Sequence, residues 1–313
     1  MSNTNQIIPF YAKRKIFFAI SATIMLIGIM SLFIKGVELD IQFKGGALLK
    51  YTYSGEINAD AVADEATELL DRPITTQLTQ DLSTDKKMII INIAGNYGVD
   101  ANDQIAFDDA LKAKFPEANL DLASSSMVEP FFGQKFLRDG MIAIALSAVL
   151  VMFYVWFRFS RIGGLSAGVM ALVALFHDCF VVFFTCVIFG IPIGDSFVAV
   201  TLSIIGYSVN DTIVIYDRIR ENTRLHPTTS VEVITDLSIS QSITRSVNTN
   251  IAVCLSVALV YILAFYNSID SIQSFALPMA VGAISGCYST ICIAGPLWVS
   301  WKNYKANKIA SAQ

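Results

Sequence analysis

Apolar residues occur in long, almost uninterrupted runs along most of the chain. Six of these runs predict membrane-spanning helices, because a helix needs about 20 apolar residues, rising 1.5 Å each, to cross a hydrocarbon core of about 30 Å. The first run exceeds the apolar core of a usual signal peptide and no small-x-small cleavage site follows it, so we interpret it as a span. The predicted spans are residues 16–34, 140–157, 163–189, 197–216, 247–265 and 274–299.

One polar stretch, between the first two spans, is too long and too regular for a loop. Its apolar positions alternate in some segments and have helical spacing in others. The resulting order, β-α-β-β-α-β, is that of the ferredoxin-like fold. The predicted fold class is therefore an all-α membrane bundle of six transmembrane helices with one inserted extracytoplasmic α+β ferredoxin-like domain. The expected strands are 48–54, 74–82, 88–93 and 120–128, and the expected helices are 57–70 and 102–115.

Composition supports a membrane protein with an acidic domain outside the bilayer. Hydrophobic residues make up 54% of the chain and charged residues 15%, with a mean hydropathy of +0.56, whereas soluble domains have about 25% charged residues. Residues 35–137 carry 17 Asp and Glu against 9 Lys and Arg, a local charge of −8. Positive charges are confined to short segments beside apolar runs, which argues against a nucleic-acid partner.

The distribution of Lys and Arg predicts that both termini lie in the cytoplasm. Basic residues occupy alternate short loops and the C-terminal tail, and short basic loops stay on the cytoplasmic side of a membrane. All three tryptophans, Trp156, Trp298 and Trp301, lie at these ends, where amphipathic rings favour the interface. The basic residues are Arg158 and Arg161; Arg218, Arg220, Arg224 and Arg245; and Lys302, Lys305 and Lys308.

These patterns divide the chain into four expected parts. A capping-box pattern, Thr229-x-x-Glu232, further predicts a separate surface helix over 230–242 ahead of the fifth span. The parts are 1–34, the cytoplasmic N-terminus and first span; 35–137, the extracytoplasmic domain; 138–301, a five-helix transmembrane bundle; and 302–313, a cytoplasmic tail.

Motifs for catalysis and metal binding are absent from the sequence. It has no G-x-x-x-x-G-K phosphate loop, no H-E-x-x-H motif, no nucleophile elbow and only two histidines. All five cysteines lie in apolar stretches, where they predict packing rather than disulfides. We therefore expect no enzyme activity, no cofactor and no metal, so any work draws on a partner or on an ion gradient.

The strongest functional signal is a carboxyl group inside the fourth predicted span. An ionised side chain near a helix centre costs about 2.5–3.5 kcal/mol, so such residues face protein or water and mark pathways. At 100° per residue, several polar side chains share one face with this carboxyl group. The face either bonds neighbouring helices or, as we favour, supports an Asp211 that gains and loses a proton. Its members are Ser203, Tyr207, Ser208, Asn210 and Asp211.

Three further residues are candidates for a proton relay with Asp211. His177 and Asp178 are adjacent in the third span, and neighbours on a helix point about 100° apart, so we expect each to contact another helix rather than one another. A purely structural role stays open for both. Arg245 either snorkels to the lipid headgroups or turns inward and stabilises the Asp211 carboxylate.

Several blocks of residues resemble the SecF family of protein-translocase subunits, which belongs with the resistance-nodulation-division type of proton-driven transporters. The most specific block is IGYSVNDTIV over 205–214, followed by DRIREN over 217–222. The resemblance covers nearly the whole chain. Supporting blocks are Phe43-Lys44-Gly45-Gly46, His177-Asp178 and residues 241–245.

The resemblance implies partners, a location and residue roles. It implies a SecD partner, the SecYEG channel, often YajC, and an unfolded preprotein that is moved across the bacterial cytoplasmic (inner) membrane by the proton-motive force. Asp211 and Arg245 match family positions linked to proton passage. Gly45 and Gly46 are candidates for a hinge, although a glycine pair also simply permits a turn.

The sequence leaves two other functions open. A proton-coupled small-molecule efflux half-transporter usually has a much larger outer region, and a passive scaffold for the channel gives a buried Asp211 no purpose. Coupling to Na⁺ instead of H⁺ is also open. The chain departs from the family at Gln42, where an acidic residue is usual, and at Glu129, where glycine is usual; both bear on how the outer domain meets the membrane part.

Overall fold

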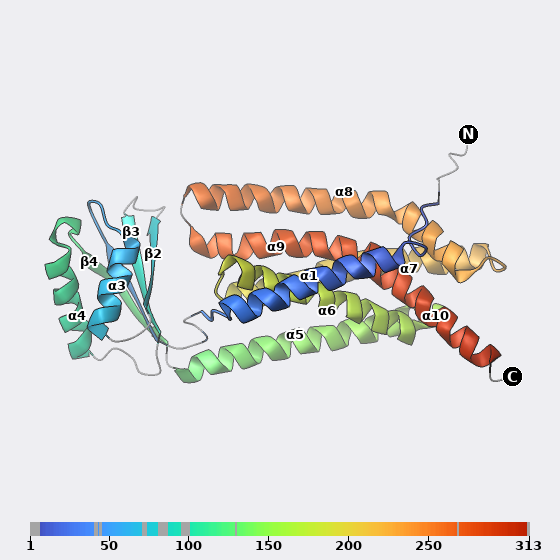
Figure 1. Cartoon of the computed structure of the whole chain (residues 1–313), viewed down its shortest axis with the longest axis horizontal. Helices are drawn as coiled ribbons and strands as arrows, with labels where there is room; N and C mark the ends of the chain where they lie inside the picture. Colours follow the sequence, from blue (N-terminus) through green and yellow to red (C-terminus); the bar gives the residue numbers. More distant parts are fainter. Residues whose placement is uncertain are drawn as a thin grey trace.

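A bundle of long helices makes up most of the structure, and a small sheet domain projects from one end of it (Figure 1). Helix α1 (Arg14–Lys35) begins and helix α10 (Gly295–Ala310) ends at the opposite end of the bundle. This computed structural model describes residues 7–40, 43, 46–70, 74–80, 87–94, 101–128, 130–267 and 269–311.

Six helical segments of the described chain are long and apolar enough to cross a membrane, which confirms the predicted number of spans. The helices run beyond the apolar stretches, because hydropathy marks only the part that suits lipid and not the polar turns that continue the helix. The spans are α1, α5 (Pro130–Arg158), α6 (Gly164–Phe189), α7 (Asp195–Leu225), α8 (Val231–Tyr266), and α9 (Asp270–Ser289) together with α10.

Helix α8 shows that the predicted separate surface helix over 230–242 is wrong. A single helix runs from Val231 to Tyr266, and no Gly or Pro interrupts it. Its hydroxyl side chains bond to carbonyls one turn back, as Thr235 does with Val231 and Ser238 with Ile234, so they do not compete with the helix. The polar first half and the apolar second half therefore belong to one continuous helix.

The last span is not one regular helix. A π-helical turn, η3 (Thr290–Ala294), separates α9 from α10, and α10 turns away from the bundle beyond it (Figure 1). Such turns are frequent at functional sites. Hydropathy over 274–299 does not reveal this turn, because one extra residue in a helical turn leaves the apolar content unchanged.

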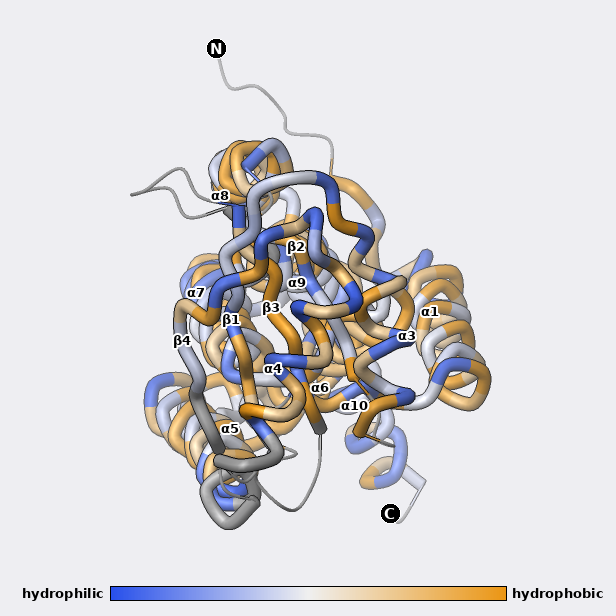
Figure 2. The backbone as a smooth tube through the Cα atoms, turned by 90° about the vertical axis from the view of Figure 1, so that its left-hand side faces the viewer, coloured by the Kyte–Doolittle hydropathy of each residue, from blue (hydrophilic) through white to orange (hydrophobic). Residues whose placement is uncertain are grey.

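The sheet domain contains four strands and two helices in the order β-α-β-β-α-β. All neighbouring strands are antiparallel, and their order is β2-β3-β1-β4. Alternate residues of the central strands, such as Leu49, Tyr51 and Ile91, share one core with α3 and α4, and Figure 2 shows hydrophobic residues along these strands. The elements are β1 (Gly46–Thr52), α3 (Ala59–Leu70), β2 (Ile74–Gln80), β3 (Lys87–Ala94), α4 (Ala101–Lys114) and β4 (Asp121–Val128).

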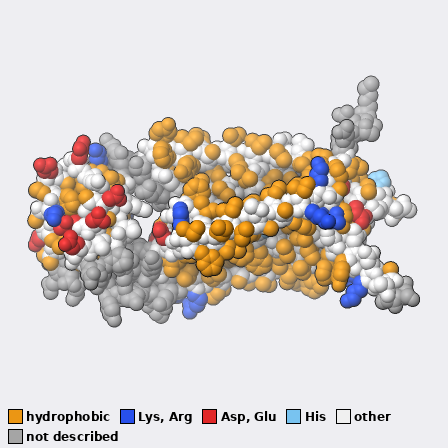
Figure 3. Space-filling view, viewed as in Figure 1, with side chains coloured by type: hydrophobic (Ala, Val, Ile, Leu, Met, Phe, Trp, Pro, Cys, Tyr) orange, Lys and Arg blue, Asp and Glu red, His pale blue; other side chains and the backbone are white. Residues whose placement is uncertain are grey.

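Three spans form the centre of the bundle and the others lie around them. Half of the α6 span and 61% of the α9–α10 span are buried inside the protein, against 6% for α1 and α5 and 11% for α8. Apolar side chains consequently cover the outside of the bundle, and charged side chains gather near its ends and on the sheet domain (Figure 3). This distribution is typical of a bundle surrounded by lipid.

Trp298 belongs to the core rather than to the membrane interface. Its side chain is 3% exposed and its ring centre lies 6.3 Å from that of Tyr216. Trp156 and Trp301 remain about half exposed, as expected for interfacial residues. Position along the span did not distinguish the three, because the direction in which each side chain points depends on the neighbouring helices.

Close packing of the central helices depends on Gly282 of α9. A Cβ atom at this position would lie 2.7 Å from Cγ1 of Ile204, on α7, and 2.8 Å from Cγ2 of Val182, on α6. Real side-chain carbons do not approach so closely. Small residues at membrane helix interfaces permit this type of contact.

We expect Gly282→Ala to destabilise the protein by about 1–3 kcal/mol, because the added methyl group overpacks the contact. Gly206→Ala is the matched control, since a Cβ atom on Gly206 would meet no atom within 4 Å and alanine suits a helix better than glycine. The measurement is the thermal unfolding midpoint of each purified variant in the same detergent. A midpoint for Gly282→Ala equal to that of Gly206→Ala would contradict the prediction.

Candidate functional site

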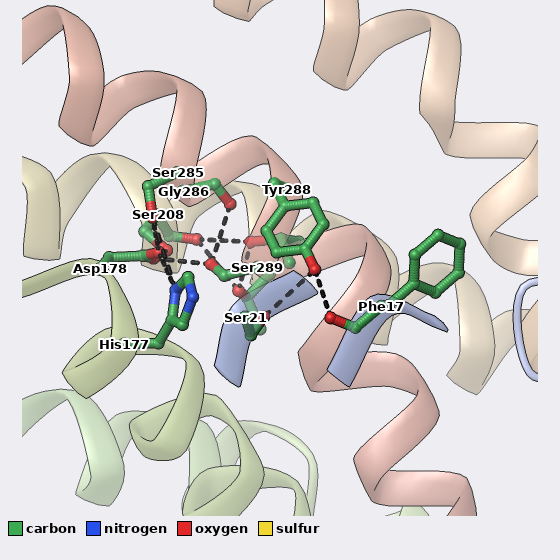
Figure 4. Close-up of polar contacts among 11 residues, drawn as sticks. Phe17, Ser21, His177, Asp178, Ser208, Ser285, Gly286, Tyr288 and Ser289 are labelled. Atoms are coloured by element: carbon green, nitrogen blue, oxygen red, sulfur yellow. Dashed lines mark hydrogen bonds and ion pairs between the residues drawn. The ribbon is translucent and has the colours of Figure 1, made fainter. Parts of the chain in front are cut away.

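The carboxylate of Asp178, on α6, is fully buried and is the centre of a polar cluster inside the bundle (Figure 4). Its Oδ2 accepts hydrogen bonds from Ser208 of α7, at 2.8 Å, and from Ser289 of α9, at 2.6 Å. Its Oδ1 accepts one from Ser285, one turn earlier in α9, at 2.6 Å. A buried charge needs such partners, because desolvation without them is very unfavourable. The cluster therefore ties three central helices together.

His177 lies beside this cluster and its side chain is 9% exposed. Its Nδ1 lies 3.2 Å from Oδ1 of Asp178 and 3.5 Å from the Ser285 hydroxyl of α9, so the two neighbours contact one another as well as another helix, whereas we expected only contacts with other helices. Their Cα–Cβ bonds point about 100° apart, but rotation of the His177 side chain brings its ring toward the carboxylate (Figure 4). The other ring nitrogen, Nε2, is buried and has no hydrogen-bond partner among the described residues.

Tyr288 extends the polar cluster to α1. Its hydroxyl donates to the backbone oxygen of Phe17 at 2.7 Å and lies 3.1 Å from the Ser21 hydroxyl. Its ring centre is 6.1 Å from that of His177, and Figure 4 shows the two rings between the carboxylate and α1. The peripheral helix α1 is thereby attached to the centre by polar as well as apolar contacts.

The carboxyl group of Asp211, on α7, has a different environment. Its side chain is only partly buried, and Oδ1 accepts a 2.5 Å hydrogen bond from Ser246 of α8. One turn further along α8, Asn250 donates to the Tyr207 hydroxyl at 3.3 Å and to the backbone oxygen of Ala283 at 2.5 Å. Asp211 thus receives its hydrogen bond from a peripheral helix, whereas Asp178 is held by central ones.

Two threonines connect the surroundings of the two carboxyl groups. The hydroxyls of Thr212, on α7, and Thr290, the first residue of η3, lie 3.0 Å apart. Both also lie near the backbone oxygen of Ser208, at 3.0 Å and 3.4 Å respectively. Ser208 donates to Asp178, and Thr212 directly follows Asp211 in α7. Because Thr290 contacts both Ser208 and Thr212, the π-helical turn lies between the surroundings of Asp178 and those of Asp211.

The residues predicted to form one polar face of α7 do not share one neighbour. Ser208 faces α6 and α9, and Tyr207 faces α8. Ser203 is exposed and bonds a carbonyl of its own helix, and Asn210 is exposed. An arc of about 100° on a helix is wide enough to meet two neighbours and an uncovered surface.

Arg245 is exposed and forms no ion pair within 4.0 Å with Asp211 among the described residues. It lies instead on the wall of a polar cavity of about 390 Å³ between α5, α7 and α8. The cavity begins one turn beyond Asp211, at Ile213 and Val214. Its other lining residues are Tyr154, Arg158, Asp217, Arg218, Glu221, Gln241 and Ser242.

Ion pairs and hydrogen bonds hold α5, α7 and α8 together around this polar cavity. Arg158 of α5 pairs with Asp217 of α7 at 3.1 Å, and Arg220 pairs with the same carboxylate at 2.6 Å. Arg218 donates to Gln241 of α8 at 2.8 Å. These arginines therefore have structural partners in addition to any role in membrane orientation.

Of the two candidate hinge glycines, Gly45 lies outside the described residues. Gly46 begins β1 with a φ of 142°, a backbone conformation that favours glycine, and it pairs with Ala94 and Val128. Gly46 is thus required where the chain enters the sheet.

Sequence reasoning named Ser208 but missed the other hydrogen-bond donors of the two carboxyl groups. Ser285 and Ser289 in α9, and Ser246 and Asn250 in α8, are each spaced four residues apart and so share a helix face. Polar pairs at this spacing inside an apolar span are a usable signal. Helix packing decides that the α9 pair bonds Asp178, whereas in α8 Ser246 bonds Asp211 and Asn250 bonds Tyr207.

The arrangement suits proton binding. A serine hydroxyl can donate to a carboxylate and can also accept from a protonated carboxyl group, so these partners satisfy both protonation states. Within the described ranges, no group of three or more His, Cys, Asp and Glu side chains is placed to hold a metal ion.

Comparisons with known proteins assign the chain to a family. A family model for the C-terminal part of the protein export membrane proteins SecD and SecF matches residues 107–304. SecF of Petrotoga mobilis is 29% identical over 93% of this chain and 94% of its own length. SecDF of Bacillus subtilis is 30% identical over 96% of this chain but only 39% of its own length.

Solved structures agree with this assignment. A crystal structure of SecDF from Thermus, described as a translocon-associated membrane protein, matches 97% of this chain and 40% of its own with a TM-score of 0.77 and 25% identity. The chain thus spans about two fifths of the SecDF proteins and more than nine tenths of the SecF relative. With more than half of its length matched by the family model, the chain belongs to the SecD/SecF family of protein export membrane proteins.

Proposed function

We propose that the chain is a proton-coupled subunit of the Sec export complex, which works with SecD to move unfolded preprotein across the bacterial inner membrane through SecYEG. One observation carries this proposal: a carboxyl group within a membrane bundle, that of Asp211, is bonded by a single hydroxyl of a peripheral helix. Relatives named protein translocase subunits support a role in transport rather than catalysis. YajC is a further partner in this proposal.

In the proposed cycle, Asp211 takes up a proton from one side of the membrane and releases it to the other. The polar cavity that begins beside Ile213 offers the route to the arginine-rich end. Protonation weakens the bond from Ser246, because a neutral carboxyl group accepts less strongly than a carboxylate. Helix α8 can then shift against α7. One charge crossing 100 mV supplies about 2.3 kcal/mol, so a few protons can bias a domain movement.

His177 and Asp178 form the inner part of the proposed relay. The buried Nε2 of His177 lacks a partner among the described residues and can accept a proton. Asp178 accepts hydrogen bonds from α7 and α9 and fixes the position of these helices against α6. Arg245, on the cavity wall, stabilises the ionised state of Asp211 when α8 moves inward.

The orientation and domain limits belong to the same proposal. Both ends of the described chain lie at the arginine-rich end of the bundle, which supports cytoplasmic termini under the positive-inside rule. The sheet domain would then be extracytoplasmic, over 35–137, between the first span and the bundle of 138–301, with 302–313 as a cytoplasmic tail. Its strand order, β2-β3-β1-β4, supports assignment to the ferredoxin-like fold.

The SecDF relatives indicate SecD as the partner, and exposed polar residues of α7 suggest where it binds. Ser203 and Asn210 are exposed at membrane depth, and a Cβ atom on Gly206 between them would meet open space. Polar groups facing lipid are unfavourable, whereas small and polar residues favour helix association. We therefore place the SecD contact on this side of α7.

We predict that Asp211→Asn abolishes the gradient-dependent part of export, because the amide keeps the shape but cannot exchange a proton. The measurement is preprotein translocation in membrane vesicles containing the SecD partner, with and without a proton gradient. Ser256→Ala, on α8, is the matched control, since its exposed hydroxyl bonds a carbonyl of its own helix and lies outside the proposed relay and SecD contact. Undiminished gradient-dependent export by Asp211→Asn would reject the proton role and favour a passive scaffold.

Asp178→Asn should instead destabilise the fold, by about 1–3 kcal/mol, because an amide has one acceptor oxygen in place of two, so at least one buried serine hydroxyl loses its acceptor. We expect its thermal midpoint in detergent to fall clearly below that of Asp211→Asn, which loses only one acceptor bond at a peripheral helix. Equal midpoints for the two variants would refute the structural distinction between the sites.

Arg245→Met tests the two interpretations of Arg245. If its charge stabilises the Asp211 carboxylate during the cycle, gradient-dependent export slows while the thermal midpoint is unchanged, because Arg245 is exposed. Full export activity would show that Arg245 only reaches the headgroups. The same vesicle assay serves, with independent proton and sodium gradients to identify the coupling ion.

A further inference from the structure

A second cavity, of about 370 Å³, lies among α5, α6 and α7 toward the end of the bundle that carries the sheet domain. Its walls are almost wholly apolar, unlike those of the polar cavity at the arginine-rich end. No step of the proposed proton cycle uses it. Lining residues that matter below are Met141, Ile144 and Ala148 of α5, Phe176 and Phe180 of α6, and Thr201 of α7.

The depth of this apolar cavity matches one leaflet of a bilayer. On α5 the lining extends from Leu137 to Ala148, which at 1.5 Å per residue is about 16 Å. Half of a hydrocarbon core of about 30 Å is about 15 Å. The cavity is therefore about as deep as one leaflet.

The apolar cavity is open to the outside of the bundle. Met141, Phe176 and Phe180 line it and are also 57%, 54% and 50% exposed. Helix α6, which carries both phenylalanines, lies between α1 and α5 (Figure 1), and Figure 3 shows apolar surface along these helices. An opening of this kind admits a ligand from the hydrocarbon rather than from water.

Thr201 gives a second, independent indication of a ligand. Its side chain is 1% exposed, and its hydroxyl is buried without a hydrogen-bond partner among the described residues. Buried polar atoms without partners are uncommon in folded proteins. Because Thr201 lines the apolar cavity, an ester carbonyl oxygen at the head of a lipid acyl chain would satisfy this hydroxyl.

We propose that the apolar cavity binds one acyl chain of a phospholipid from the leaflet next to the sheet domain. An extended polypeptide fits less well, because the almost wholly apolar walls offer almost no partners for its backbone N–H and C=O groups. At the surface end, exposed Lys135 and Arg138 flank Leu137, although Arg138 also pairs with Asp139 at 3.2 Å. Basic side chains there suit the lipid phosphate. This site is independent of proton coupling.

Photocrosslinking of the full chain in detergent tests the proposal. The probe is a phosphatidylethanolamine with a diazirine in the middle of one acyl chain, and labelled positions are identified by mass spectrometry. We expect labelling at Met141 and Phe176 to saturate at one lipid per chain and to decrease with excess unlabelled phosphatidylethanolamine. Labelling at Leu255, which is 67% exposed on α8, should rise without saturation.

Two tryptophan substitutions on α5 give a matched pair. Ala148→Trp fills the cavity and should weaken the saturable labelling by at least about tenfold, equivalent to about 1.4 kcal/mol. Leu146→Trp lies on the opposite side of the same helix, is 55% exposed and outside the lining, and should leave the labelling unchanged. Thermal midpoints show whether both variants fold.

The wild-type result alone can overturn the proposal, whatever the variants do. Non-saturating labelling at Met141 and Phe176, as at Leu255, would mean ordinary lipid contact rather than a site. Displacement of the probe by a synthetic apolar peptide but not by unlabelled phospholipid would assign the cavity to a polypeptide instead. Equal labelling of folded Ala148→Trp and Leu146→Trp would also exclude binding in this cavity.

Discussion

The buried carboxylate of Asp178 is the constraint on which the rest of the bundle depends. A charge in so apolar a place is tolerated only with several hydrogen-bond donors, and these come from Ser208, Ser285 and Ser289. Satisfying them fixes the rotation of α7 and α9 against α6. Since residues three apart on a helix differ by about 60°, the same rotation turns Asp211 toward α8.

The central helices α6, α7 and α9 are thus bonded to one another at Asp178, whereas Asp211 is bonded by the peripheral helix α8. Only 11% of the α8 span is buried, whereas half of the α6 span is. Helix α8 nevertheless supplies the bond to Asp211 through Ser246 and the bond to Tyr207 through Asn250. A change of charge at Asp211 therefore acts on the contact between a central and a peripheral helix. The π-helical turn at Thr290 joins this contact to the Asp178 cluster.

Two cavities lie along α7, one with apolar walls and one with polar walls. Ile205 lines the apolar cavity and Ile213 lines the polar one, about 12 Å apart along the helix axis. Asp211 lies close to the polar end of this interval. Along α7, Asp211 therefore lies nearer to the lining of the polar cavity than to that of the apolar one, although it lines neither cavity.

The sequence by itself determined the six spans, the order of strands and helices in the sheet domain, and the unusual carboxyl groups, because hydropathy and period are local properties of the chain. It also singled out Asp178, Asp211 and Arg245. Only the tertiary structure decided that Ser285 and Ser289 donate to Asp178 while Ser246 donates to Asp211. It also decided that the His177 ring contacts Asp178 and that α8 is continuous. The reason is physical: hydrogen-bond partners on different helices depend on helix rotation and spacing, which packing fixes and no local pattern records.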